Sequence, residues 1–418
     1  MVNAQRSMVN GSKRVLLVVM GLLIIMVPIL AQSQTTFNRK TLLKEIKTKL
    51  KATNYDDADK TLRKAFDEHV DLKTDDELNY IEMNIQEKLV EAENRKIFLH
   101  NKPDTAKYFS HIYNMYNYGL AVSGSSKKYS KGVTQSLLKY RNNLLSGGKF
   151  HYMKLQYADA YKYLNMYITT NYHPVLTRDI TYQAYQDTLA LSRWATIAAF
   201  GNKQYEDVLA YLPSALQDTV NRQKLLEIGA KANMELKDSV SALKYLKEGR
   251  ENDVLNDYFC YSLIDYYTEK RNYEEVVRLS SETYEALPTP MDSVKASRLL
   301  YIRGKSEEIL QRHDSALNTL KKAIEFNPSD VKGYHSIGTI YLRKAHTLVE
   351  QNTSLPPRSA AYRKMKVKLD SYYDLAAKSF ENVRKLNEKD TSQWLTELRE
   401  CYYKLNKGKE LKKLEQYE

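Results

Sequence analysis

Apolar residues recur along this chain at a spacing typical of stacked pairs of helices. Val208, Ala242 and Val276 are each 34 residues apart, and Gly304 and Gly338 are separated by the same interval. Each such unit has an apolar face that only a neighbouring copy can cover. The pattern therefore predicts an all-α fold, an α-solenoid of helix-turn-helix repeats.

A short phrase predicts where the second helix of a unit begins. It consists of a tyrosine, two positions that are mostly acidic, and then Ala or Val, and it begins at Tyr55, Tyr157, Tyr205 and Tyr273. Acidic residues in the first turn of a helix face the positive end of its dipole. We expect the array to begin near residue 40. Its period fades between Glu68 and Asn142, where two helices are predicted over 76–100 and 104–119.

Two adjacent units carry a known repeat pattern. The unit 297–330 contains Leu300, Gly304, Ala316, Leu320, Ala323 and Pro328, and the next unit contains Tyr334, Ile337, Gly338 and Tyr341. This resembles the tetratricopeptide repeat (TPR), in which W-x2-L-G-x2-Y is followed by A-x3-F and a proline. The chain is similar to exported TPR array proteins of bacterial cell envelopes. The resemblance implies a right-handed superhelix whose concave groove, lined by first helices, holds a peptide or partner domain.

The last repeat is predicted to be longer than the others. The stretch between Tyr341 and Ala376 is far longer than the repeat requires, and this insert contains Pro356 and Pro357. Apolar residues at steps of three and four predict one long helix over 360–386. We therefore expect an extended C-terminal hairpin, followed by a capping helix with a charged tail that faces water.

The N-terminus has the pattern of an export signal. Three basic residues precede an apolar run over 15–31, and small residues at Ala31 and Ser33 allow cleavage after either one. The alternative is an uncleaved anchor, because the run is just long enough to span a bilayer. We expect a signal peptide or anchor over 1–33, a degenerate helical region over 34–134 and the array over 135–418, with a flexible loop at 123–132.

The charge balance predicts a mildly basic surface. The chain has 64 Lys and Arg against 51 Asp and Glu, a formal net charge of +13, and the excess is spread along the sequence. Export to the periplasm or cell envelope argues against a nucleic-acid partner. A protein or peptide partner is favoured, membrane association through the N-terminal segment remains open, and an oligosaccharide is a further alternative.

Residues for partner binding follow from the repeat register. Where Leu300 and Gly304 face a packed helix, a second face of the same helix carries the side chains that a groove would present. The residues on this second face in three units predict a concave binding stripe formed by Tyr258, Tyr261, Tyr301, Lys305, His335 and Thr339. The 34 tyrosines are mostly assigned to packing, with a minority in the groove.

The sequence shows no pattern of catalytic residues. His346 and Glu350 are spaced for a metal pair on one helix but lack a third ligand. The Ser146–Lys149 segment matches Ser-x-x-Lys and is interpreted as a helix end broken by Gly147 and Gly148. Cys260 and Cys401 are expected to be free thiols at packing positions. We expect no cofactor and no enzymatic activity.

Three functional hypotheses follow. The first is a non-catalytic envelope scaffold that binds a protein or peptide in the groove of the superhelix. The second is a membrane-anchored sensory module or a module that captures oligosaccharide. The third is self-association through the extended C-terminal hairpin.

Overall fold

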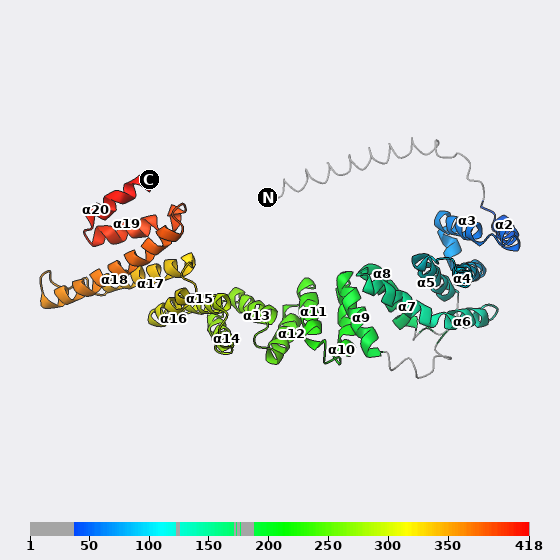
Figure 1. The fold of residues 1–418 in the computed structure, drawn as a ribbon, viewed down its shortest axis with the longest axis horizontal. Coiled ribbons are helices and arrows are strands. Elements are labelled where there is room, and N and C mark those ends of the chain that lie inside the picture. Colours follow the sequence, from blue (N-terminus) through cyan, green and yellow to red (C-terminus); the bar gives the residue numbers. More distant parts are fainter. Residues whose placement is uncertain (1–36, 123–125, 171–172, 174–175, 177–187, 418) are drawn as a thin grey trace, which may run out of the picture. The chain divides into compact units, whose positions relative to one another are not determined.

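The computed structural model describes residues 37–417, apart from 123–125, 171–172, 174–175 and 177–187. In these ranges every regular element is a helix, and most helices follow one another in pairs joined by short turns (Figure 1). The predicted all-α helical repeat fold is confirmed. The predicted leader over 1–33 lies outside the described residues, and none of the described helices is long and apolar enough to cross a membrane.

The helices group into two compact units, and α8 (Tyr157–Thr169) contributes residues to both. The first unit contains α2 (Arg39–Lys51), α3 (Tyr55–Glu68), η1 (Val70–Thr74), α4 (Asp76–Phe98), α5 (Thr105–Ala121), α6 (Ser130–Lys139) and α7 (Arg141–Met153). The predictions for 76–100 and 104–119 are confirmed by α4 and α5. The predicted boundary between residues 134 and 135 falls inside α6, which begins within the segment predicted as a loop.

The second unit is the regular array. Its first helices are α9 (Thr188–Gly201), α11 (Arg222–Glu235), α13 (Asp257–Glu269), α15 (Ser293–Ile309), α17 (Val331–Glu350) and α19 (Leu395–Lys404). Its second helices are α10 (Tyr205–Ala215), α12 (Ser239–Asn252), α14 (Tyr273–Glu285), α16 (His313–Phe326) and α18 (Ala360–Leu386). The chain continues through η4 (Thr391–Gln393) before α19, and through α20 (Gly408–Lys413) and η5 (Leu414–Tyr417) after it.

The turns inside the helix pairs share one backbone geometry. The predicted starts at Tyr55, Tyr157, Tyr205 and Tyr273 are the first residues of α3, α8, α10 and α14. Two positions before a second helix, the chain adopts a positive φ at a residue other than glycine, as at Lys203, Lys237, Arg271 and Gln311. The next amide then donates to the carbonyl five residues earlier, for example from Asn272 to Tyr267 at 2.8 Å. This bond caps the first helix and reverses the chain.

Glycines lie where the two helices of a pair approach most closely. A Cβ on Gly304 would lie 2.7 Å from Leu320, and one on Gly338 would lie 2.7 Å from the Phe380 ring. Gly338 and Phe380 are 42 residues apart, whereas Gly304 and Leu320 are 16 apart. The difference of 26 residues is the length of the predicted insert. The repeat register therefore continues through the insert.

The pair Gly147 and Gly148 corrects one prediction. These residues lie inside α7 instead of ending a helix, and a Cβ on Gly148 would lie 2.7 Å from Leu164 in α8. Gly148 and Leu164 have the same spacing as Gly304 and Leu320, so Gly148 has the role of Gly304 in an earlier repeat. Glycine weakens an isolated helix, but here close packing of the two helices outweighs that local cost.

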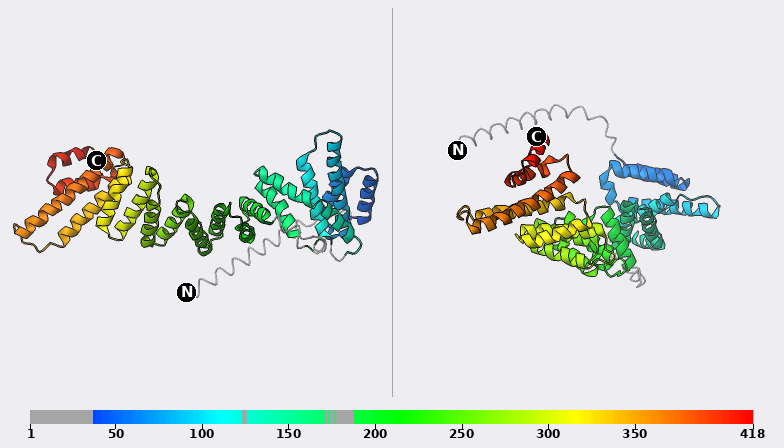
Figure 2. Two further views of the ribbon diagram at one scale, coloured as in Figure 1. Left: turned by 60° about the horizontal axis from the view of Figure 1, so that its bottom comes forward. Right: turned by 60° about the vertical axis from the view of Figure 1, so that its left-hand side comes forward.

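The extended C-terminal hairpin is confirmed. α17 has 20 residues and α18 has 27, whereas α16 has 14. The far ends of α17 and α18 extend beyond the adjacent pair α15–α16 (Figure 2). Near their base, both helices share an apolar core with α19 that includes Phe380, Trp394 and Leu398.

The C-terminal tail departs from the prediction that it simply faces water. Lys409, Lys412 and Lys413 are exposed, but Leu414 is buried, and the Tyr417 ring lies 5.0 Å from the Trp394 ring in an edge-on contact. Trp394 is fully buried as a result. The tail therefore covers the end of the apolar core instead of lying only in solvent.

A buried polar network lies between α3, α4 and α5. Glu82 is fully buried and accepts a hydrogen bond from Gln86 Nε2 at 2.7 Å, and the same nitrogen donates to Asp59 at 2.6 Å. His111 Nδ1 lies 2.7 Å from Gln86 Oε1 and must be the donor, because an amide oxygen only accepts. Burial, and then the neighbouring Asp59 carboxylate, raise the pKa of Glu82 well above its ordinary value.

Candidate protein-interaction surface

Tyr258, a member of the predicted stripe, contacts the preceding first helix. The ammonium group of Lys231 in α11 lies 4.7 Å from the centre of the Tyr258 ring in α13. Lys231 also forms an ion pair with Glu227 on its own helix. Burial raises the pKa of Tyr258 to about 12, so its hydroxyl stays protonated. The half-buried ring and the cation above it form one joint between repeats.

Tyr261, one turn further along α13, contacts the following first helix. The guanidinium group of Arg298 in α15 lies 3.9 Å from the centre of the Tyr261 ring. Arg298 is exposed. A guanidinium group over an aromatic ring keeps its N–H donors for other contacts, and the exposure of Arg298 makes them accessible to a partner.

Lys305 belongs to an ion-pair cluster that joins α15 to α17. Its ammonium group lies 2.8 Å from Glu308, and the Glu308 carboxylate also lies 3.3 Å from Arg343 in α17. The Glu308 side chain is only 4% exposed, whereas those of Lys305 and Arg343 are 43% and 47% exposed. A buried carboxylate thus holds two cations at the surface.

His346 forms the next joint, between α17 and α19. Its Nε2 atom lies 2.6 Å from Glu400 Oε1. His346 and Glu350 are spaced for a metal pair, but His346 instead contacts a residue 54 positions away. No group of three or more His, Cys, Asp or Glu residues in the described part of the chain is placed to hold a metal ion.

These contacts form a series that we call the first-helix ladder. It links α11 to α13, α13 to α15, α15 to α17 and α17 to α19, so from α11 onward each first helix contacts the next one through charged or aromatic side chains. The ladder consists of Lys231, Tyr258, Tyr261, Arg298, Lys305, Glu308, Arg343, His346 and Glu400. Its aromatic faces and half-exposed cations are suited to contacts between proteins.

The other predicted stripe residues lie on the same helices but make different contacts. Tyr301 is half-buried and packs against the C-terminal core. The His335 ring lies edge-on to Phe380 with 5.8 Å between ring centres. Thr339 donates its hydroxyl hydrogen bond to the His335 carbonyl of its own helix at 2.9 Å. The six stripe residues therefore do not form one cluster, and their role in partner binding stays a prediction.

Sequence reasoning missed Lys231, Arg298, Arg343 and Glu400. The available signal is spacing, since Tyr261 and Arg298 are separated by slightly more than one repeat, and so are Glu308 and Arg343. A search for charged and aromatic residues at this interval would have found both contacts.

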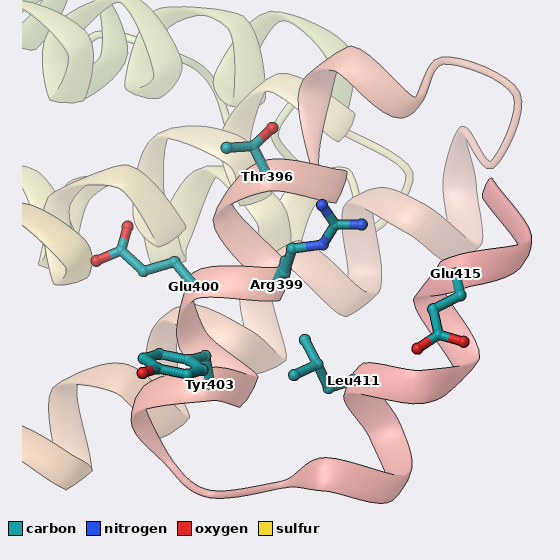
Figure 3. Close-up of a pocket in the computed structure, with 6 residues that line it drawn as sticks. All are labelled: Thr396, Arg399, Glu400, Tyr403, Leu411 and Glu415. Atoms are coloured by element: carbon teal, nitrogen blue, oxygen red, sulfur yellow. The ribbon is translucent and has the colours of Figure 1, made fainter. Parts of the chain in front are cut away.

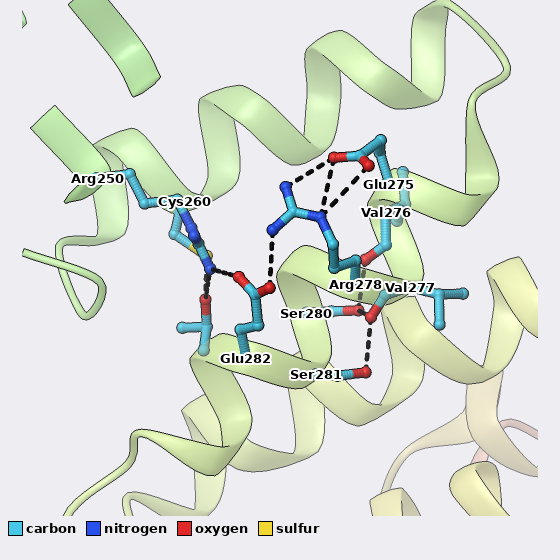
Figure 4. Close-up of polar contacts among 10 residues, drawn as sticks. Arg250, Cys260, Glu275, Val276, Val277, Arg278, Ser280, Ser281 and Glu282 are labelled. Atoms are coloured by element: carbon cyan, nitrogen blue, oxygen red, sulfur yellow. Dashed lines mark hydrogen bonds and ion pairs between the residues drawn. The ribbon is translucent and has the colours of Figure 1, made fainter. Parts of the chain in front are cut away.

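The second helices α12 and α14 are linked by an ion pair, which Figure 4 shows with its neighbours. Arg250 of α12 lies 2.9 Å from Glu282 of α14, and Arg278 lies 2.7 Å from the same carboxylate. Arg250 also approaches Thr283, whose hydroxyl lies 3.4 Å from the Cys260 thiol. Burial raises the pKa of Cys260. Cys260 and Cys401 are both buried and free, as predicted.

A cavity of about 440 Å³ lies at the C-terminal end of the array (Figure 3). Its lining comes from α19, α20 and η5 and consists of Thr396, Arg399, Glu400, Tyr403, Leu411 and Glu415. Glu400 also belongs to the first-helix ladder, so the cavity adjoins the last joint of that surface. Tyr403 is 68% exposed and offers an aromatic face there.

No protein-family model matches the chain, and no curated protein matches it in sequence. Solved structures similar to it include TPR proteins at low sequence identity. A TPR repeat protein from Bacteroides fragilis is 14% identical over 63% of this chain and 98% of its own, with a TM-score of 0.28. The C-terminal part of a TPR protein from Cytophaga hutchinsonii is 12% identical over 60% of this chain and 97% of its own, with a TM-score of 0.35. The P58(IPK) TPR domain is 13% identical over 88% and 98%, with a TM-score of 0.27.

Proposed function

We propose that this chain is a non-catalytic scaffold that binds a protein or peptide partner along the first-helix ladder. The observation that carries the proposal is continuity, because side chains suited to protein interfaces join every successive first helix from α11 to α19. Solenoids use such extended surfaces for binding. Tyrosine rings supply contact area with few rotatable bonds, and the arginine and lysine side chains set the register of the partner.

A crosslinking experiment with a matched control tests the scaffold. A photoreactive amino acid is placed at Arg298 or Lys305 on first helices, and at Lys244 or Lys247 on the second helix α12. Lys305 is half-buried and the other three residues are exposed. We expect one protein to be captured at the first two positions only, and its purified form to give a defined complex with the full chain by light scattering. Capture of the same proteins at all four positions would contradict the proposal.

We also propose that the scaffold acts in the cell envelope after export. Support comes from the basic residues, apolar run and small-residue sites of the leader over 1–33. The intact mass of the protein from fractionated cells tests this. A mass that corresponds to cleavage after Ala31 or Ser33 supports a signal peptide, and retention in the membrane with the full mass supports an anchor. A full-length cytosolic protein would contradict export.

A further inference from the structure

The far end of the α17–α18 hairpin carries a concentrated positive charge. We define the hairpin tip as residues 349–368, which include Arg358, Arg363, Lys364, Lys366 and Lys368 but only one acidic residue, Glu350. Five basic side chains minus one acidic side chain give this short segment a net charge of +4, whereas the whole chain has +13. Other segments are also basic, since α2 has six Lys and Arg against one Glu, so net charge alone does not single out the tip.

Most of these cations are not neutralised by neighbours. Among the described contacts, Lys366 forms an ion pair with Asp370, and the Lys368 ammonium lies 5.8 Å from the Tyr372 ring. Arg358, Arg363 and Lys364 are exposed and have no ion pair or hydrogen bond from their side chains within the described residues. By contrast, Arg343 and Lys344 nearer the base pair with Glu308 and Asp314.

Apolar side chains are exposed between the cations. Val367 is 72% exposed and Val349 is 42% exposed, and Leu355 and Tyr362 are half-buried beside them. An apolar group next to several cations is the combination that binds peripheral proteins to anionic membranes, because hydrocarbon insertion and attraction to headgroups act together.

The arrangement of the cations favours a lipid surface over an acidic protein. At 100° per residue, Arg363, Lys364, Lys366 and Lys368 spread over about 200° of the circumference of α18. A groove that recognises an acidic peptide would need its cations on one face. A projecting tip with cations on several sides suits a broad anionic surface that imposes no register.

We propose that the hairpin tip docks on an anionic phospholipid surface. Arg358, Arg363 and Lys364 contact headgroup phosphates, and Val367 and Val349 enter the interface between headgroups and acyl chains. This activity is separate from the scaffold function, because the tip lies beyond the residues that form the first-helix ladder.

Vesicle cosedimentation of the full chain tests the proposal. One vesicle preparation is phosphatidylcholine alone, and in the other phosphatidylglycerol replaces a third of it. We expect binding to the second preparation and at least about tenfold weaker binding for the double variant Arg363→Glu/Lys364→Glu. The matched control Lys244→Glu/Lys247→Glu changes the net charge equally on exposed positions of α12 and should bind like the wild type.

All three proteins share the same N-terminus, so their differences report on the tip alone. Thermal unfolding should give the same midpoint for the two variants, which separates loss of binding from loss of fold. Equal weakening in both double variants would overturn the proposal in favour of a general charge effect. Absence of vesicle binding together with binding to polyglutamate would overturn it in favour of an acidic protein partner.

Discussion

At the residue scale, Glu82 is a buried acid whose surroundings raise its pKa well above the ordinary value. It is fully buried and faces Asp59 and Arg63 of α3, Gln86 of its own helix and Tyr118 of α5. Because its pKa is raised, the folded protein binds a proton there that the unfolded chain releases above about pH 4.3. The Glu82 contribution to stability is therefore fully present at low pH and is lost as the pH rises through the folded pKa.

Replacement of Glu82 by Gln should stabilise the first unit at neutral pH. The amide keeps the shape and hydrogen-bonding capacity of the protonated acid but cannot ionise. We expect the difference in unfolding free energy between Glu82→Gln and the wild type to grow with pH above about 4.3. Urea unfolding at several pH values, monitored on helices α2–α5 by hydrogen exchange, measures it. A difference that does not change with pH would show that Glu82 is ionised in the folded state.

Gly338 gives a second prediction at this scale. Its missing Cβ leaves room for the Phe380 ring, so Gly338→Leu forces α17 and α18 apart and should lower the unfolding free energy by about 1–3 kcal/mol. The matched control is Gly408→Leu, because a Cβ on Gly408 would meet no atom within 4 Å. Denaturant unfolding compares the two variants. Equal stability of both would contradict the close approach at Gly338.

At the element scale, the turn is the feature that repeats most strictly. A residue other than glycine costs about 1–2 kcal/mol in the left-handed region, and these turns accept that cost in order to cap one helix and begin the next. This conformational cost is confined to the residue with positive φ, so a substitution in one turn should change it without affecting the other turns.

Gln311 offers a direct test of this cost. It has φ = 59°, it is exposed, and it precedes α16 by two positions. We expect Gln311→Gly to raise the unfolding free energy by up to about 1 kcal/mol, and Gln311→Val to lower it, because a β-branched side chain is least tolerated at positive φ. Thermal unfolding of the three proteins gives the order. A glycine variant less stable than the valine variant would contradict the left-handed geometry.

How well each helix could be predicted depended on how regularly its apolar residues recur along the sequence. α18 was predicted over its full length because its apolar positions keep steps of three and four from Tyr362 to Leu386. The end of α7 was predicted too early because Gly147 and Gly148 signal a helix end locally, and only their close approach to Tyr163 and Leu164 explains why the helix continues. The interval from Gly148 to Leu164 equals that from Gly304 to Leu320, and this match is the sequence signal for the continued helix.

At the scale of the whole molecule, repetition made the fold predictable, whereas the surface was predicted only in part. A regular repeat interval fixes which helices pair, since each repeat packs against its neighbours. It does not fix which surface side chains meet across repeats. Tyr258 and Tyr261 were predicted from their positions relative to buried residues, but their cationic partners lie on other helices, 27 residues before Tyr258 and 37 residues after Tyr261.

The array architecture predicts that damage to the ladder stays local. Arg343→Met removes one of the two cations that face the buried Glu308 carboxylate, and Lys305 retains the other. We expect a loss of about 1–2 kcal/mol in the second unit. Hydrogen exchange should rise in α15–α18 and stay unchanged in α2–α5. A rise in α2–α5 would contradict the expected local response.

Because α18 is longer than α16, the C-terminal hairpin reaches past the adjacent helix pair. The whole of the extra length of α18 over α16 precedes the contact between Gly338 and Phe380. At a rise of about 1.5 Å per residue, it carries the start of α18 about 20 Å past the end of an ordinary pair. A surface held at that end would stand clear of the repeat bodies by roughly the diameter of two helices. The hairpin would then act as a spacer, leaving room for a partner on the first helices while its tip is engaged.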